Sequence, residues 1–311
     1  MNEDYPRTLL ELENRFATEA ACREYLMALR WPTGFVCPHC GGRKSWKMVR
    51  NLLLCSICRR QVSVVAGTVF QDTRLPLVLW FRAMWHVTNE KNGVSALSLQ
   101  RALGLGSYKT AWFLLHKLRR AMVRPDRDQL EGAVEVDEAY WGGKEEGVTG
   151  RLTKDKALIF IAVEEKIEGK RTIVGRCRLF KIPDTLRTTL HQAIADTIKQ
   201  GSTVRTDGLS SYLGLKEYVH EQQIQTQQPV GEHVLPRAHL VISLFKRWLM
   251  GTHQGSADHK YLDDYLNEFT FRFNRRKSKS RGKLFYRLVQ QAVALAPIPC
   301  ASITTQHVGG G

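Results

Sequence analysis

Two pairs of cysteines have the spacing of a metal site. Cys37 and Cys40 form one Cys-x2-Cys pair, Cys55 and Cys58 form a second, and fourteen residues separate the pairs. Each pair can form a tight turn that presents two thiolates to one ion, and two such turns complete the tetrahedron that structural zinc prefers. The spacing therefore predicts a zinc ribbon. The alternatives are four buried free thiols, or a site in which His39 replaces one thiolate.

Carboxylates occur in two predicted strands. Strand alternation in residues 134–140 turns Glu135 and Asp137 to one face, and Asp207 ends another strand directly before a glycine. Paired carboxylates can hold divalent ions that activate a water or a 3′-hydroxyl for phosphodiester chemistry. An aspartate before a glycine is also common in turns, so neither segment establishes a site by itself.

Composition and charge limit the class of protein. The chain has 311 residues, a net charge of +16 and a pI of about 9.7. Its 43% hydrophobic and 24% charged residues exclude wholesale disorder and fibrous repeats. No apolar stretch approaches the roughly 20 residues of a membrane span, and the acidic first residues lack the apolar stretch of a secretory signal. We expect a cytoplasmic protein with a polyanionic partner and no membrane contact.

A helix-turn-helix is predicted over residues 95–122, where two helical patterns flank a turn with two glycines. On the second helix the apolar residues share one side, and Lys109, His116 and Arg120 are expected on the opposite side. That arrangement is typical of a DNA-recognition helix, and also of an ordinary surface helix.

A second basic segment lies near the carboxyl end. Residues 237–290 hold 12 Lys and Arg against 4 Asp and Glu, and Arg272, Arg275 and Arg276 begin the densest run. Such a run would neutralise several phosphates of a nucleic acid. A solubilising face and a membrane-surface contact are the alternatives.

The order of the predicted elements indicates an α+β protein of several domains. Residues 1–70 are expected to hold an N-terminal helix and the zinc ribbon, and residues 71–130 the helical, helix-turn-helix-like DNA-binding region. In residues 131–297 three strands, a helix and a fourth strand precede further helices, which indicates an α/β sheet domain. Residues 298–311 are expected to be a flexible tail.

Together these segments resemble bacterial insertion-sequence transposases of the zinc-ribbon, ISXO-like type, whose catalytic domain is RNase H-like with a DDE motif. The resemblance covers nearly the whole chain. The matching segments are FVCPHCGG, CSICRRQVSVVAGTVFQDTRLPL, LHKLRRAM, VEVDEAYWGGK, TDGLSSY, SLFKRWLMGTHQG and YLDDYLNEFTFRFNRR.

The resemblance implies roles for four residues. Asp137 would be the first catalytic carboxylate and Asp207 the second, both binding Mg²⁺ or Mn²⁺, and Lys246 would hold a phosphate near the cut. The third position, usually Glu or Asn, is His239, which makes the pattern a DDH variant. His239 would be a metal ligand, a general base on the attacking water, or an ordinary histidine; imidazole suits manganese or zinc better than magnesium.

The function expected from the resemblance is DNA transposition. The protein would bind terminal inverted repeats and target DNA, cut and join strands with two metal ions, and assemble as a homo-oligomer on DNA in the nucleoid. One alternative is a catalytically silent DNA-binding protein derived from such an enzyme. Another is a junction nuclease of the same fold, which would prefer branched DNA.

Overall fold

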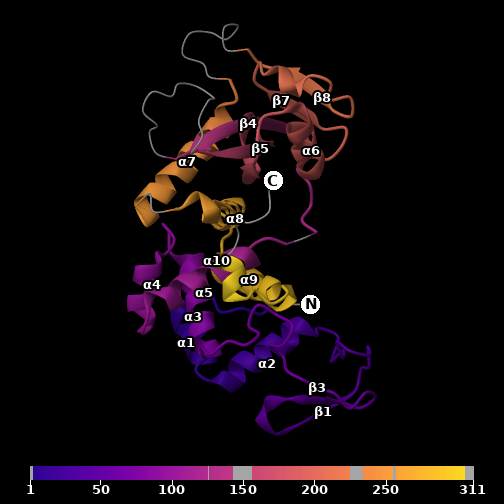
Figure 1. The fold of residues 1–311 in the computed structure, drawn as a ribbon, viewed down its shortest axis with the longest axis vertical. Helices are drawn as coiled ribbons and strands as arrows, with labels where there is room; N and C mark the ends of the chain where they lie inside the picture. Colours follow the sequence, from indigo (N-terminus) through magenta and orange to yellow (C-terminus); the bar gives the residue numbers. More distant parts are fainter. Residues whose placement is uncertain (1–2, 125, 143–155, 225–233, 255–256, 305–311) are drawn as a thin grey trace. The chain divides into compact units, whose positions relative to one another are not determined.

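The computed structural model describes residues 3–124, 126–142, 156–224, 234–254 and 257–304. Contacts between elements divide the chain into two compact units (Figure 1). The N-terminal unit comprises Met1–Arg124 and Ser278–Gly311, and the sheet unit comprises Pro125–Lys277.

The N-terminal unit is a cluster of helices with a small sheet. Thr8 and Thr18 directly precede its first two helices, and their hydroxyls accept hydrogen bonds from backbone amides of the first turn, as N-caps do. The helices are α1 (Leu9–Arg15), α2 (Glu19–Arg30), α3 (Leu77–Asn89), α4 (Ala96–Leu103), α5 (Tyr108–Ala121), α9 (Gly282–Ala294) and α10 (Cys300–Thr304).

Helix α9 completes the core of this unit although it lies at the far end of the chain. The ring of Phe285, on α9, lies 6.0 Å from that of Phe16, 5.6 Å from Phe81 and 6.0 Å from Trp85, all between centroids. All four side chains are buried. The expected catalytic domain, residues 131–297, extends past the end of the sheet unit at Lys277. Residues 278–297 pack with the N-terminal helices instead, because α9 supplies the aromatic side chain that those helices enclose. In the expected tail, α10 is a short helix with Ile303 buried.

The predicted helix-turn-helix is present. Helix α4 ends at Gly104, which has φ of +62°, a left-handed conformation that favours glycine. Ser107 caps the start of helix α5, because its hydroxyl accepts a hydrogen bond from the amide of Lys109.

The zinc ribbon contains a three-stranded antiparallel sheet in the order β1-β2-β3. Its inner face buries Leu53, Cys55 and Val62 with Cys37, and Trp31 packs against this cluster. The strands are β1 (Ser45–Lys47), β2 (Leu53–Cys55) and β3 (Gln61–Val62), and the turn between β1 and β2 contains η1 (Val49–Asn51).

The sheet unit is built on one mixed sheet in the order β6-β5-β4-β7-β8. Strands β4, β5 and β6 pair antiparallel, whereas β7 and β8 run parallel to β4. This arrangement is the RNase H-like α/β domain that was expected; the sequence prediction had omitted β8. The strands are β4 (Ala133–Trp141), β5 (Ala157–Glu168), β6 (Arg171–Ile182), β7 (Thr203–Thr206) and β8 (Val219–Gln222).

Helices cover both faces of this sheet (Figure 1). Val134 and Val136 of β4 face a core shared with α6 (Arg187–Thr197) and η2 (Ser210–Tyr212). Ala139 of β4 and the alternate residues of β5 face a second core shared with α7 (Pro236–His253), η4 (His259–Tyr261) and α8 (Leu262–Asn274). The predicted alternation of β4 is therefore confirmed. None of the helices in the described ranges is long and apolar enough to cross a membrane.

Candidate active site and zinc centre

Asp137 and Asp207 lie on neighbouring strands, Asp137 in the middle of β4 and Asp207 directly after β7. Strands β4 and β7 pair in parallel with Glu135 opposite Arg205, so the next residues on the same face of each strand are Asp137 and Asp207. Adjacent strands are about 4.8 Å apart, which brings the two carboxylates near one another on one face of the sheet. Asp207 follows β7 directly, and its Oδ1 accepts a hydrogen bond of 3.0 Å from the amide of Leu209.

His239 meets Asp137 from the helix that covers this face. Its Nε2 lies 3.9 Å from Oδ2 of Asp137, and the two side chains are 54% and 15% exposed. Burial raises the pKa of Asp137, and the nearby charge of Asp207 raises it further, while His239 and the amide of Glu138 oppose that rise. A carboxylate that is both buried and close to a second carboxylate is the environment that a bound cation would stabilise.

Lys246 lies on the same helix as His239. The two residues are seven apart on α7, two turns or about 10 Å, which brings them to one face of the helix. Burial lowers the pKa of Lys246, and Asp137 opposes that shift, so the ammonium interacts electrostatically with the same carboxylate. The structure thus brings Asp137, Asp207, His239 and Lys246 together.

Glu135 fixes the start of helix α7 against the sheet. The residue before the helix, Leu235, has φ of +51° and no side chain that can cap. Oε2 of Glu135 instead accepts hydrogen bonds of 2.7 Å from the amide of Arg237 and 2.8 Å from that of Ala238. The Glu135 side chain is 1% exposed, so a buried negative charge lies at the positive end of the helix dipole. Because Ala238 directly precedes His239, this contact sets where His239 lies along β4.

An ion-pair network extends from this contact across the sheet. Nη1 of Arg237 lies 2.7 Å from Oε1 of Glu135 and 3.2 Å from Oε1 of Glu165, on β5. Glu165 also pairs with Arg205 of β7, at 2.5 Å, and Arg205 pairs with Glu221 of β8, at 2.7 Å. The network joins α7 to four of the five strands. The sequence prediction missed Arg237 and Glu165, since their partners lie far away in the chain.

Glu138 belongs to the opposite face of β4. Its carboxylate accepts a hydrogen bond from the hydroxyl of Tyr212, which is fully buried. Burial, together with the charge of Glu138, raises the pKa of Tyr212 well above its ordinary value. Glu138 therefore joins β4 to η2 on the face of the sheet opposite Asp137.

The four predicted zinc ligands converge. The sulfur atoms of Cys37, Cys40, Cys55 and Cys58 all lie within 4.8 Å of one another, with 3.7 Å between Cys37 and Cys58 and 3.6 Å between Cys40 and Cys55. A tetrahedron with Zn–S bonds of about 2.3 Å requires sulfurs about 3.8 Å apart, so the four thiols fit zinc. Amides of Cys58 and Ile57 donate to Cys55 and lower its pKa, whereas the neighbouring thiols raise the pKa of Cys40. A bound Zn²⁺ ion would stabilise all four sulfurs as thiolates.

No other group of three or more metal-ligating side chains is this close within the part of the chain that the structure describes. His39 is exposed, and its Nδ1 lies 3.2 Å from Nη1 of Arg60. The imidazole of His39 therefore contacts Arg60, and the group of side chains that could hold the metal consists of the four cysteines.

The residues predicted to contact DNA differ in exposure. Lys109 is exposed and Arg120 is half-buried. His116 is buried, which corrects its expected place on the exposed side of α5: its ring lies 4.0 Å from that of Trp112, and its Nε2 lies 3.4 Å from Nη1 of Arg119.

The predicted arginines of α8 and its end have partners inside the sheet unit. Arg272 pairs with the buried carboxylate of Glu268 at 3.2 Å. The guanidinium of Arg275 lies 3.9 Å from the ring centroid of Phe271. Nη1 of Arg276 donates to the carbonyl of Gly175 at 3.1 Å, and Nη2 donates to that of Val174. These contacts join the end of α8 to β6, so part of the charge of this basic segment serves the fold.

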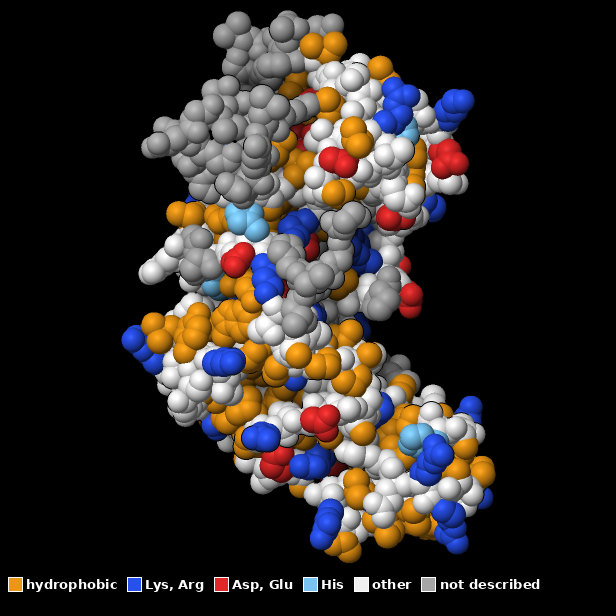
Figure 2. Space-filling view, in the orientation of Figure 1, with side chains coloured by type: hydrophobic (Ala, Val, Ile, Leu, Met, Phe, Trp, Pro, Cys, Tyr) orange, Lys and Arg blue, Asp and Glu red, His pale blue; other side chains and the backbone are white. Residues whose placement is uncertain are grey.

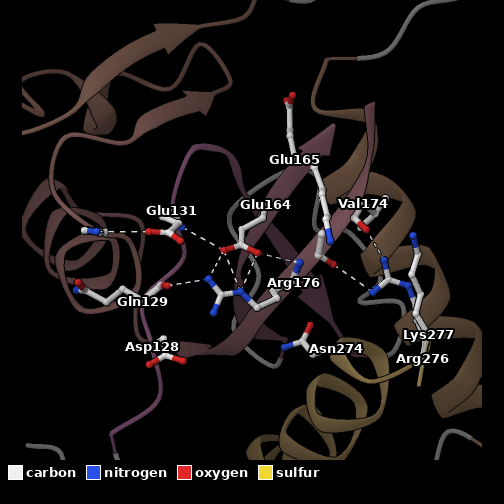
Figure 3. A pocket seen from close by; sticks show the side chains of 13 residues that line it. Asp128, Gln129, Glu131, Glu164, Glu165, Val174, Arg176, Asn274, Arg276 and Lys277 are labelled. Atoms are coloured by element: carbon white, nitrogen blue, oxygen red, sulfur yellow. Dashed lines mark hydrogen bonds and ion pairs between the residues drawn. The ribbon is translucent and has the colours of Figure 1, made fainter. Parts of the chain in front are cut away.

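A polar pocket of about 750 Å³ lies along β5, β6 and the end of α8. At its centre Glu164 accepts hydrogen bonds from Arg176 and from the amide of Glu131 (Figure 3). Asn274 pairs through its amide with both the N–H and the carbonyl of Cys177. Asp137 and Asp207 do not line this pocket, and its central charges satisfy one another, so we do not assign it to the candidate active site.

Two family models match the chain. Residues 129–274 match the ISXO2-like transposase domain, and residues 17–61 match the transposase zinc-ribbon domain. The first match lies within the sheet unit, and the second covers α2 and the four clustered cysteines. A relative from Halobacterium salinarum, described as an uncharacterized protein in transposable element ISH50, is 26% identical over 285 residues, which cover 83% of this chain and 91% of that protein.

Proposed function

Because this chain belongs to the insertion-sequence transposases that combine a zinc ribbon with an ISXO2-like domain, we propose that it cuts and joins DNA strands at the ends of its element. The observation that carries the proposal is the approach of three side chains. Asp137 lies within β4, Asp207 directly follows the neighbouring parallel strand β7, and Nε2 of His239 lies 3.9 Å from Asp137.

The residues that would hold catalytic metal are Asp137, Asp207 and His239. Bound Mg²⁺ or Mn²⁺ ions would supply Lewis-acid activation of the attacking hydroxyl and charge stabilisation of the leaving oxygen. The donor set fits such ions, since two carboxylates raise each other's electrostatic energy and an imidazole adds a neutral nitrogen.

The other residues act on geometry and on the phosphate. Lys246, half-buried and within the field of Asp137, would hold a phosphate oxygen beside the cut. Glu135 would act as a positioning residue, because it binds the amides directly before His239. The same proposal includes recognition of terminal inverted repeats by the zinc ribbon and by α5, and assembly of at least a homodimer on DNA, since transposition requires two element ends together.

The test is strand cleavage and joining by the zinc-loaded protein on DNA carrying the sequences that flank its gene. Wild type, Asp137→Asn and His239→Ala are compared in Mg²⁺ and in Mn²⁺, and His239→Glu restores the usual third carboxylate. We expect cutting at the flank boundaries in wild type, none in Asp137→Asn, and a shift in preference from Mn²⁺ toward Mg²⁺ in His239→Glu. Tight specific binding without cutting in either metal would favour the silent DNA-binding protein instead. Cutting of branched DNA with no dependence on flank sequence would favour the junction nuclease.

A further inference from the structure

The outer face of the small sheet in the zinc ribbon carries an exposed tryptophan. The register places Trp46, Leu54 and Gln61 in one row across the three strands, and the inner face of the same sheet holds the core with Leu53. The Trp46 side chain is 51% exposed. A tryptophan on the outer face of so small a sheet contributes little to the core, and tryptophan is enriched at interfaces with other molecules.

Arg59 adds a cation to that face. It has φ of +58°, which few residues other than glycine adopt. Its guanidinium lies 5.0 Å from the ring centroid of Trp46. An exposed aromatic ring with an arginine over it offers both a flat surface and a charge.

The turn between β1 and β2 carries a second set of exposed groups. Arg50 and Asn51 have φ of +65° and +59°, as in the tight left-handed turns of hairpins. This geometry exposes Val49, at 85%, and Met48, at 40%, at the tip of the hairpin. The backbone is closed behind them by a 2.8 Å hydrogen bond from the amide of Met48 to the carbonyl of Leu52.

The charge of the segment identifies the kind of partner. No Asp or Glu occurs between Glu24 and Asp72, and that interval contains seven Lys and Arg. Six of these are exposed: Arg43, Lys44, Lys47, Arg50, Arg59 and Arg60. A zinc ion with four thiolates carries a charge of about −2, which these cations exceed. In Figure 2 basic and hydrophobic side chains occupy the visible face of this part, at the lower right. A polyanion fits such a surface.

We infer that the β1–β2 hairpin enters the major groove of duplex DNA, with the turn at base edges and with Trp46 and Arg59 against the sugar-phosphate backbone. The major groove is about 12 Å wide and admits a two-stranded β-ribbon. Arg50, at the tip, is the residue type that binds guanine O6 and N7 most often. This inference deepens the proposed function, because its DNA is the DNA of the element ends.

The test measures binding and not cutting, so its outcome is independent of the catalytic proposal. Full-length zinc-loaded protein carrying Asp137→Asn is titrated with duplexes of the sequences that flank the gene, at several salt concentrations. Arg50→Gln, Arg59→Gln and Trp46→Ala are made in that background. Arg7→Gln is the matched control, since it removes one exposed cation before α1. The zinc content of each variant shows that the ribbon still folds.

We expect Arg50→Gln to weaken binding about tenfold or more and to remove protection of a particular guanine N7 from methylation. Arg59→Gln should lower the slope of log affinity against log salt by about one. Trp46→Ala should weaken binding to all duplexes alike, because a contact with the sugar-phosphate backbone carries no sequence information.

Three outcomes would overturn the inference: binding losses no larger than that of Arg7→Gln, unchanged N7 protection in Arg50→Gln, and equal binding to vesicles of anionic phospholipid. If cleavage by wild type fails while these binding results hold, the catalytic proposal alone is lost. If cleavage occurs and the hairpin variants bind like the control, this inference alone is lost.

Discussion

Replacing Glu135 by Gln tests how much the negative charge of Glu135 stabilises the start of helix α7. Glutamine keeps the shape and one acceptor oxygen, so neutral hydrogen bonds to the amides of Arg237 and Ala238 can persist. The lost charge leaves Arg237 with Glu165 as its ion-pair partner in the network and removes the anion from the helix N-terminus.

The expected magnitude follows from the burial of the pair. Truncating one partner of a buried ion pair costs about 3–5 kcal/mol, and hydrogen bonds to charged groups contribute about 1.5–3 kcal/mol each. Because glutamine retains part of these bonds, we expect the free energy of unfolding of the sheet unit to fall by about 2–3 kcal/mol. Unfolding of this unit should then occur about 5–10 °C lower.

The assay is thermal and urea unfolding of the full chain, followed by a probe in the sheet unit. Glu221→Gln is the control, since it is the same substitution in the same network but at a side chain 47% exposed. Its cost should be within about 1 kcal/mol. Equal losses of stability in the two variants would refute the claim that Glu135 caps helix α7.

A catalytic readout tests whether Glu135 acts through His239. Cleavage by Glu135→Gln should fall at least tenfold at a temperature where the protein stays folded. In a His239→Ala background the same substitution should have little further effect, because contacts that act through one another are not additive. Full additivity of the two substitutions would assign Glu135 a role in stability alone.

Three further predictions concern other parts of the molecule. Gly42→Ala should lower zinc affinity about tenfold, measured by competition with a chromogenic chelator, because its methyl group would lie 3.2 Å from the sulfur of Cys55. Asp137→Asn should abolish metal-dependent cleavage and leave the affinity for duplex DNA within about threefold, since it removes a metal ligand and no phosphate contact; a large loss of binding would contradict this. Burial raises the pKa of Glu164, but its hydrogen bonds with Arg176 outweigh that effect and hold the pKa below the ordinary 4.5. The pair therefore stabilises the fold above that pH and less as the pH falls through the lowered value, so Arg176→Gln should cost about 1–3 kcal/mol at pH 7 and clearly less at pH 3 in urea unfolding.

The features that the sequence predicted depend on short-range patterns. The spacing of two Cys-x2-Cys pairs predicts a tetrahedral cluster without knowledge of the rest of the fold. The alternation of residues in β4 predicts the face of the sheet on which Asp137 lies. The neighbourhood of Asp137 and Asp207 then follows once β4 and β7 are adjacent and parallel.

The features that the sequence did not predict depend on distant partners. Glu135 and Arg237 are 102 residues apart, and nothing near either residue marks the contact. Strand β8 has only four residues with little apolar pattern, so its place is set by pairing with β7. The burial of His116 was missed because a histidine on a basic helix has the composition of a surface residue.

The position of helix α9 near the end of the chain determines which of the two units is fully synthesised first. The core of the N-terminal unit includes Phe285, whereas the elements of the sheet unit lie between Pro125 and Lys277. During synthesis the sheet unit therefore leaves the ribosome whole while the N-terminal helices still lack one of their aromatic partners. A chain that stops after Lys277 would retain every predicted catalytic residue and lose instead α9, whose Phe285 fills part of the core of the unit that contains the zinc ribbon.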